Sequence, residues 1–256
     1  MNPRPHRRGW LKAAGAGLAG LWLAGCERMN ASPAVQRALL QAEGLNLRVH
    51  RLLQNRKALA REFAPSDISR DFRANGSVDP DDPAYRAHLA AGFAEWRLVV
   101  DGLVERPLSL SLAELRSLPA RTQITRHDCV EGWSSIGQWT GARLGALLDK
   151  AGLGREARYV VFHCADNLGG GPGGHYYESI DLVDAFHPQT ILAYAMNGRP
   201  LPVAHGAPVR LRVERQLGYK HAKYVMRIEA VADLGRIGGG RGGFWEDRGY
   251  EWYAGI

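Results

Sequence analysis

One stretch, TRHDCVEGWSSIGQWTG at residues 125–141, constrains the fold more than any other part of the 256-residue chain. Its cysteine, Cys129, stands among charged side chains and tryptophans, and the residues before it have the pattern of a strand. A structural cysteine usually has apolar neighbours, whereas Cys129 lies close to Arg126, Asp128 and Glu131. Such surroundings favour a thiolate, which binds metals or attacks electrophiles. We therefore expect a strand that leads into a loop with a functional cysteine.

On composition alone, a lone cysteine is more often a small buried hydrophobe than a ligand. The stretch as a whole argues otherwise, because it resembles the cofactor-binding core of the sulfite oxidase family, molybdopterin enzymes in which one cysteine ligates molybdenum. The Cys-Val-Glu-x-Trp-Ser run resembles the branch of that family that reduces methionine sulfoxide in the periplasm. By this resemblance Cys129 is the molybdenum ligand. The matching positions are Arg126, Cys129, Val130, Glu131, Trp133, Ser134, Trp139, Thr140, Gly141, Leu144, Leu147 and Leu148.

The composition is that of an ordinary globular protein with one sizeable core, since 45% of the residues are hydrophobic and 23% are charged. The formal net charge of +7 suits an anionic cofactor or substrate, but a solvated basic surface explains it equally well. We expect no nucleic-acid partner, because no cluster of Lys and Arg with interleaved aromatic residues occurs. Cys26, Cys129 and Cys164 form no C-x-x-C pair, which leaves zinc knuckles, thioredoxin-type centres and c-type haem unsupported.

The first 25 residues have the pattern of a processing signal. Arg7 and Arg8, followed by an aromatic residue and a Leu-Lys pair, fit a twin-arginine export signal. Residues 13–24 are too short to span a membrane and fit the apolar part of a signal. Residues 23–26, Leu-Ala-Gly-Cys, match a lipobox, so we expect cleavage before Cys26 and a lipid on its thiol; simple cleavage nearby is the alternative. Because this route carries folded, often cofactor-loaded proteins, we expect a periplasmic protein.

After the signal we expect a helical spacer at residues 26–63 and one domain at residues 64–256. The resemblance covers that domain and implies an α+β fold of the sulfite oxidase type, with mixed sheets and short helices. The residue patterns predict strands at 96–100, 123–126 and 159–164 and a helix at 144–151. Ser109 or Ser111 is expected to cap a short helix that carries Glu114. The aromatic tail, residues 250–253, is expected to pack on the domain as part of the funnel wall.

A second block, residues 205–223, carries groups that the resemblance assigns to the cofactor. The family has a His- or Asn-Gly-x-Pro-x-Arg segment and then a Gly-x-Lys-x-x-Lys-type turn, and this block is similar to both. Arginine grips phosphate bidentately, lysine adds a point charge, and backbone N–H groups of a turn complete an anion site. Taken singly, Arg210 and Lys223 would be exposed strand charges, and Asn75 would be a turn residue. The implied cofactor-binding residues are Asn75, Cys129, His205, Arg210, His221, Ala222 and Lys223.

The resemblance also implies catalytic roles. Arg126 would hold a substrate oxyanion or polarise an S=O bond, with His127 and Asp128 as adjacent candidates. Tyr177 matches a tyrosine that points toward the metal, and Tyr176 is the alternative register.

The expected function is oxygen-atom transfer by a molybdenum–molybdopterin enzyme, which reduces a small-molecule or protein-bound sulfoxide or a related S- or N-oxide. The chain has no haem motif, so the expected redox partner is a haem membrane subunit or a cytochrome. Its length leaves no room for the second, immunoglobulin-like domain of sulfite oxidase proper, which disfavours sulfite-type anion oxidation. Two further classes of protein fit the same residues: a lipid-anchored binding module without metal, and a cofactor-free thiol enzyme with His127 as base.

Overall fold

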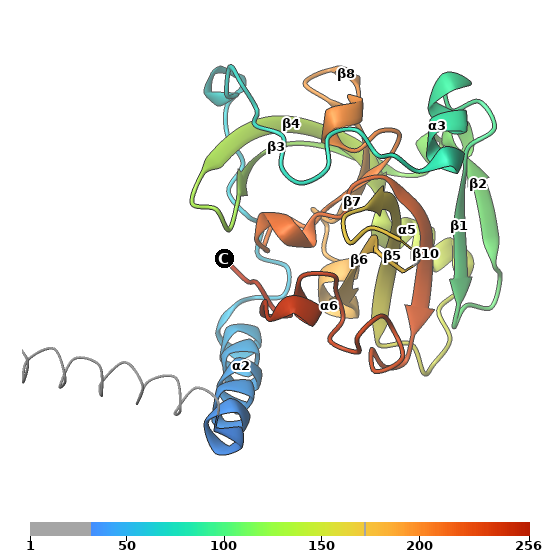
Figure 1. Ribbon diagram of the computed structural model, residues 1–256. Helices are drawn as coiled ribbons and strands as arrows, with labels where there is room; N and C mark the ends of the chain where they lie inside the picture. The colour runs from blue at the N-terminus through green and yellow to red at the C-terminus, as the bar shows by residue number, and fades with distance from the viewer. Residues whose placement is uncertain (1–31, 172) are drawn as a thin grey trace, which may run out of the picture. The chain divides into compact units, whose positions relative to one another are not determined.

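The computed structural model describes residues 32–171 and 173–256, which belong to two compact units, one ending at Leu53 and the other comprising Gln54–Ile256 (Figure 1). The described part of the first unit is the helix α2, Pro33–Leu53, which falls within the segment expected to be helical. The expected signal and Cys26 lie outside the described residues. Within the described ranges, no helix combines the length and the apolar character needed to cross a bilayer.

The second unit contains two sheets joined by short helices, which is the α+β architecture that the sequence predicts. One sheet has the order β2-β1-β10-β5-β6, and the other has the order β3-β4-β7-β8 with β9 paired to β7. The strands are β1 Arg97–Gly102, β2 Leu108–Ser111, β3 Ala120–Asp128, β4 Ser134–Arg143, β5 Tyr159–Asn167, β6 His175–Asp181, β7 Ile191–Met196, β8 Arg199–Pro200, β9 Arg210–Arg212 and β10 Val225–Val231. The helices are α3 Pro83–Ala90, α4 Leu112–Arg116, α5 Leu144–Ala151 and α6 Leu182–Ala185, with 3-10 turns η1 Pro65–Asp67, η2 Val203–His205, η3 Gly218–Lys220 and η4 Glu246–Arg248.

Local sequence signals account for several of these elements. Ser111 caps α4 through a reciprocal pair of hydrogen bonds with Glu114, which stabilises a helix too short to form alone. Leucines at helical spacing bury one face of α5, which ends at Ala151 and is followed by Gly152 with φ of +70°. β3 and β5 cover the strands predicted there, β1 begins one residue after the predicted start at Trp96, and β5 continues beyond the predicted end to Asn167. These predictions are confirmed.

The main core contains side chains of both sheets and of α5. β1 and β10 pair in parallel, whereas β3 and β4 form a long antiparallel hairpin that is conspicuous in Figure 1. The hairpin keeps its register from Ala120 opposite Ala142 to Asp128 opposite Ser134, so residues 129–133 make its turn. This register places Cys129 at the tip of two rigid strands, which is a well-defined position for a functional side chain.

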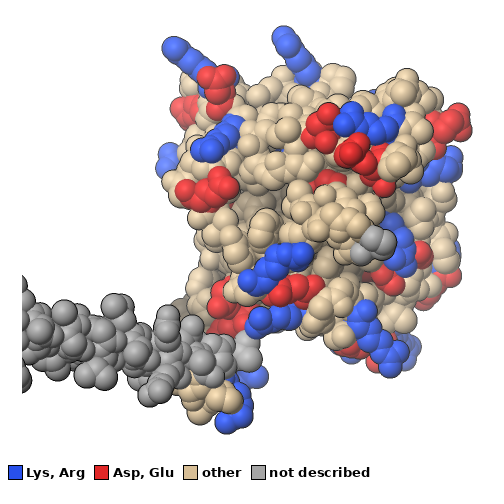
Figure 2. Space-filling model, viewed as in Figure 1, with Lys and Arg blue, Asp and Glu red and all other residues tan. Residues whose placement is uncertain are grey.

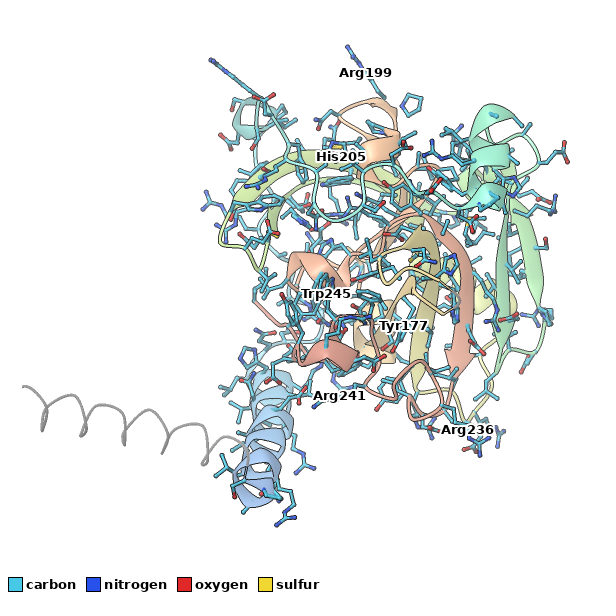
Figure 3. All side chains as sticks on the ribbon, in the orientation of Figure 1. Tyr177, Arg199, His205, Arg236, Arg241 and Trp245 are labelled. Atoms are coloured by element: carbon cyan, nitrogen blue, oxygen red, sulfur yellow. The ribbon has the colours of Figure 1, made fainter. Side chains whose placement is uncertain are left out.

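Residues 54–63 belong to the second unit and extend the sheet at β3. Glu62 pairs with Thr125, and the Phe63 N–H donates to the Ile124 carbonyl at 2.9 Å. The compact unit therefore begins before residue 64, the boundary expected from composition. Over the face of this unit shown in Figure 2, basic and acidic side chains are interspersed. Arg199, at the start of β8, points outward (Figure 3).

Candidate active site

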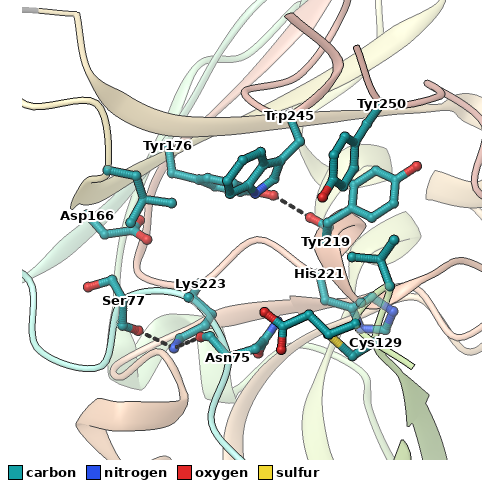
Figure 4. A pocket seen from close by; sticks show the side chains of 15 residues that line it. Asn75, Ser77, Cys129, Asp166, Tyr176, Tyr219, His221, Lys223, Trp245 and Tyr250 are labelled. Atoms are coloured by element: carbon teal, nitrogen blue, oxygen red, sulfur yellow. Dashed lines mark hydrogen bonds between the residues drawn. The ribbon is translucent and has the colours of Figure 1, made fainter. Parts of the chain in front are cut away.

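A cavity of about 730 Å³, its open mouth included, lies beside Cys129 (Figure 4). Its lining comes from segments far apart in the sequence: the loop at residues 75–77, the β3–β4 turn, the end of β5, β6, η3 and the segment after β10. Side chains with polar or aromatic chemistry gather here, namely Asn75, Cys129, Glu131, Asp166, Tyr176, Tyr219, His221, Lys223, Trp245 and Tyr250. The fold therefore brings together residues from both informative blocks of the sequence.

Cys129 is held by the hairpin turn. Its N–H donates to the Trp133 carbonyl at 2.9 Å, and its carbonyl accepts the Gly132 N–H at 3.0 Å. The side chain is 8% exposed and the thiol is free. Burial raises its pKa, against backbone N–H groups that lower it, and the Glu131 carboxylate raises it further. The expectation that the neighbouring charges favour a thiolate is therefore wrong for the protein alone; a cation bound at Sγ would be needed.

Two cations beside this cavity lack acidic partners. Arg210, 1% exposed, donates to two backbone carbonyls at 3.1 and 3.3 Å, and its Nε has no partner. The Lys223 ammonium donates to the carbonyls of Asn75 at 2.9 Å, Ala204 at 2.7 Å and Ser77. Within residues 32–171 and 173–256, neither cation forms an ion pair with a carboxylate. An anion at this end of the cavity would supply the missing partner.

The pKa values of the basic groups beside the cavity are lowered, which reflects burial and an excess of positive charge there. Burial first, and then Arg212, lowers the pKa of Arg210 to about 9. Burial and Arg210 lower the pKa of Lys223 to about 7, and burial with Arg210 and Lys223 lowers that of His205 to about 4. Asp166, an acid that lines the same cavity, has its own pKa raised to about 6, mainly by burial. The partial negative charge of Asp166 offsets only part of the excess positive charge.

Two histidines beside the cavity each keep one ring nitrogen unsatisfied. The Arg212 guanidinium donates to His127 Nδ1 at 3.0 Å, which places the proton of the neutral ring on Nε2. That Nε2 is buried without a partner and faces Gly218, where an added Cβ would lie 2.5 Å from it. His221 Nε2 donates to the Gln216 carbonyl at 3.0 Å, so Nδ1 keeps a free lone pair. Burial lowers the pKa of both rings, which keeps them neutral.

These unsatisfied atoms fit molybdopterin. Buried polar atoms are normally hydrogen-bonded, so orphaned atoms beside one cavity indicate a polar ligand. Arg210 and Lys223 suit its phosphate, the His221 lone pair suits a ring N–H, and Cys129 is a thiol at the part of the cavity formed by the hairpin turn. The donor set thus matches a ligand with an anionic end, a polar ring and a metal-binding end.

The predicted cofactor residues fall into two layers. Asn75, Cys129, His221 and Lys223 line the cavity, whereas Arg210, His205 and Ala222 do not. Arg210 NH1 donates to the His205 carbonyl and its NH2 to the His221 carbonyl, so this second layer supports the first. Ala222 is 1% exposed. In the Asn75–Gly76 pair, the residue with positive φ is Gly76, at +61°. Asn75 therefore does not serve as a left-handed turn residue.

Arg126 lies elsewhere, although its sequence position suggested contact with the substrate. Alternation along β3 turns His127 inward and Arg126 outward. Its side chain is 55% exposed, and its Nε pairs with the Asp128 carboxylate at 2.8 Å. It lines an outer hollow with Phe63 and Ile256 and is not among the residues around the Cys129 cavity. The structure therefore removes the basis for a substrate-holding role.

The two adjacent tyrosines of β6 also point to opposite faces. Tyr176 lines the cavity, and its hydroxyl donates to the Tyr219 carbonyl. Tyr177, the preferred register match, donates instead to the Asp247 carboxylate on the other face of β6, near the C-terminal segment that also carries Trp245 (Figure 3). Tyr176, the alternative register match, is therefore the tyrosine that reaches the cavity.

Sequence reasoning missed several residues that line the cavity: Asp166, Tyr219 and Trp245. Asp166 and Tyr219 each follow or adjoin a recognised motif, but nothing in their local pattern says which way the side chain points. Trp245 lies before the aromatic tail, and of that tail, residues 250–253, it is Tyr250 that lines the cavity.

Comparison with known proteins agrees with this geometry. Residues 86–234 match the family model described as the oxidoreductase molybdopterin binding domain. Over 252 residues the chain is 38% identical to the "Putative protein-methionine-sulfoxide reductase subunit YedZ1" of Azospira oryzae. This alignment covers 98% of this chain and 88% of that relative. Over 165 residues it is 37% identical to the protein-methionine-sulfoxide reductase catalytic subunit MsrP of Xanthomonas campestris, covering 61% of this chain and 51% of that relative.

Against that second relative, the chain spans about half of the relative's length. Among solved structures, the sulfane dehydrogenase SoxCD from Paracoccus pantotrophus aligns with 54% of this chain and 39% of its own, at 24% identity and a TM-score of 0.49. The family model spans more than half of the chain, and a relative at 38% identity aligns along nearly all of it. The chain therefore belongs to the oxidoreductase molybdopterin binding domain family and is a molybdopterin-dependent oxidoreductase of the sulfite oxidase type.

Proposed function

We propose that this enzyme reduces sulfoxides, with methionine sulfoxide in polypeptides as the substrate class. One observation carries the proposal: a free cysteine and Lys223 line one cavity with Arg210 in the layer behind, and among the described residues neither cation has an acidic partner, which suits a metal-bearing, phosphorylated cofactor. Two relatives whose names describe methionine sulfoxide reductase subunits support the choice of substrate. The chain's own residues fit the role described next.

Cys129 Sγ would be the single protein ligand of molybdenum. Among the described residues, no group of three His, Cys, Asp or Glu side chains is placed to hold a metal, so the remaining ligands would come from the cofactor. Arg210 and Lys223 would bind its phosphate, and a phosphate there would hold the Lys223 ammonium protonated. Asn75, His205, His221 and the backbone of Ala222 would hold the rest of the cofactor.

When bound, the cofactor supplies oxygen-atom transfer coupled to two electrons. Reduction of a sulfoxide to a thioether and water consumes two electrons and two protons. The chain's part is to position the sulfoxide and to limit water. Tyr176, Tyr219 and Trp245 form an aromatic side of the cavity that serves this purpose, and Arg126 has no part in it.

The cellular setting belongs to the same proposal. A twin-arginine signal at residues 1–25 would export the loaded protein to the periplasm, and a lipid on Cys26 would hold it at the membrane. A haem membrane subunit or a cytochrome would deliver the electrons.

The test is molybdenum and pterin content together with sulfoxide reduction, on protein exported from a host that makes the cofactor. We expect near-stoichiometric molybdenum in the wild type and its loss in Cys129→Ser. Cys164→Ala is the matched control, because Cys164 is also buried and free but packs in the core. Oxidation of sulfite without sulfoxide reduction would contradict the substrate, and folded wild-type protein without molybdenum would contradict the cofactor.

A further inference from the structure

The cavity has two sides of different chemistry. Figure 4 shows Asn75 and Cys129 on one side and Trp245 and Tyr250 on the other. The first side, with Lys223, is where the cofactor is proposed to bind. A substrate that reaches the metal end must then pass between that cofactor and the aromatic side.

The aromatic side is a packed cluster rather than a set of isolated rings. Trp245 and Tyr250 stack with their ring centroids 5.4 Å apart, and Tyr219 meets the Tyr250 ring edge-on at 5.2 Å. Tyr250 is 37% exposed, as is Leu168, and Val130 beside Cys129 is 47% exposed. All of these residues line the cavity, so part of its exposed lining is apolar. Such a rim suits a side chain presented on a polypeptide better than a free, strongly hydrated anion.

An ion pair and two hydrogen bonds hold residues 242–253, the C-terminal segment that carries two of these rings. Glu246 accepts from the Lys220 ammonium at 2.6 Å, and both side chains are buried. The Tyr219 hydroxyl donates to the Glu251 carbonyl at 2.6 Å, and Trp252 Nε1 donates to Ser179 Oγ at 2.9 Å. A wall held this way keeps its shape before substrate arrives, which lowers the cost of binding.

The same segment lies outside the region that defines the family. The family model ends at residue 234, before Trp245 and Tyr250. The cofactor side of the cavity, by contrast, takes Cys129, His221 and Lys223 from within the matched region. Cys129, His221 and Lys223 thus lie within the region that the family model covers, whereas Trp245 and Tyr250 lie after it.

We infer that Trp245 and Tyr250 are specificity-determining residues, which receive the CH₂–S(O)–CH₃ end of an oxidised methionine side chain. The inference rests on the proposed function and names the residues that select its substrate. Sulfur and methyl groups make favourable contacts with the faces and edges of aromatic rings. A ring pair on this wall therefore holds the thioether end of the substrate and leaves the S–O bond turned toward the cofactor side.

The test compares two substrates on the cofactor-loaded enzyme: a peptide with one methionine sulfoxide, and dimethyl sulfoxide, which has the same S(O)–CH₃ group but no CH₂ stem and no polypeptide to contact the rim. For Trp245→Ala we expect KM for the peptide to rise about tenfold with kcat changed less than about threefold, a loss typical of one buried aromatic contact. The kcat/KM for dimethyl sulfoxide should also fall, but by less than that for the peptide, because the smaller substrate makes fewer contacts with the wall. Trp245→Phe should restore most of the peptide KM, and Tyr250→Ala should act like Trp245→Ala but more weakly.

Phe186→Ala is the matched control, since Phe186 is a 43% exposed aromatic residue that does not line this cavity. A second readout is independent of turnover: quenching of tryptophan fluorescence by the oxidised peptide should be largely lost in Trp245→Phe. Equal losses on both substrates, or an unchanged peptide KM in Trp245→Ala, would overturn the inference. A wild-type enzyme that reduces neither sulfoxide would instead refute the proposed function, and that result appears before any variant is made.

Discussion

Two buried lysines of one short segment, Lys220 and Lys223, have opposite surroundings. The Lys220 ammonium is fully buried between two carboxylates, of Glu178 and of Glu246 at 2.6 Å. Burial alone would lower the pKa of Lys220, but these carboxylates outweigh it and raise the pKa. Among the described residues, the hydrogen-bond acceptors of Lys223 are backbone carbonyls, and burial with Arg210 lowers its pKa to about 7.

The same contrast recurs on strand β9. Arg212 is fully buried and forms a two-pronged ion pair with Glu214, at 2.9 and 2.5 Å. Arg210, two residues before it, is just as buried and has no such partner among the described residues. A buried charge is tolerated when it is paired, and an unpaired one destabilises the fold. Charges paired within the chain support the fold, whereas the two cations without an acidic partner among the described residues are the ones proposed to bind an anionic ligand.

The largest expected effect is on stability, at the paired lysine. Lys220→Met leaves Glu178 and Glu246 buried together without their cation, and we expect a loss of about 3–5 kcal/mol in the free energy of unfolding. Urea unfolding of the cofactor-free protein measures it. Adding Glu178→Gln and Glu246→Gln to the variant should recover much of the loss, because no uncompensated charge remains. A loss below about 1 kcal/mol in the single variant would show that the ion pairs of Lys220 do not support the fold.

The next effect is on cofactor retention, at the unpaired lysine. Lys223→Met removes a cation that the protein alone does not neutralise, so we expect a smaller loss of stability than in Lys220→Met. Retained molybdenum and pterin after dialysis should fall about tenfold or more, because a charge-assisted bond to phosphate is lost. Arg210→Met should behave like Lys223→Met, and Arg212→Met should behave like Lys220→Met. Full retention in both Arg210→Met and Lys223→Met would show that the phosphate binds elsewhere.

Sequence reasoning reached the elements whose signals are local. The capping pair of Ser111 and Glu114, the leucine spacing of α5 and the strand before Cys129 are all readable within one short window. The resemblance added the residues around the cavity that belong to short motifs, such as His221 and Lys223.

The misplaced residues have a common physical cause. Arg126 and His127 point to opposite faces of β3, as Tyr176 and Tyr177 do on β6, because side chains alternate along a strand. Which face of a strand meets the cavity depends on how the sheet packs. The sequence of one strand does not contain that information. Pairing is equally non-local: Lys220 meets an acid from η4 and another from β6, so its difference from Lys223 is invisible before folding.

A pH titration sharpens the comparison further. In the cofactor-free protein the pKa of Lys223 is about 7, against a value of 10.5 for the unfolded chain, so between these pH values the unfolded state binds the extra proton. Stability should therefore rise with pH across this window by up to about 1.4 kcal/mol per pH unit. The difference in unfolding free energy between the wild type and Lys223→Met isolates this contribution from other titrating groups. Loading the cofactor should abolish the slope, and a flat difference curve without cofactor would contradict the assignment.

The smallest effect tests the same rule on an uncharged group. The Tyr177 hydroxyl is satisfied by Asp247, so it should be structural, whereas Tyr176 lines the cavity. Tyr177→Phe should lower the free energy of unfolding by about 1 kcal/mol, the usual value of one hydrogen bond, and leave molybdenum content and dimethyl sulfoxide turnover unchanged. Asp247 still accepts the Gly239 N–H at 2.7 Å, which limits the cost. Tyr176→Phe frees the Tyr219 carbonyl at the cavity wall and should lower turnover more than stability. If Tyr177→Phe instead abolished turnover at full molybdenum content, a group satisfied within the chain would be catalytic, and the rule drawn from the two lysines would fail.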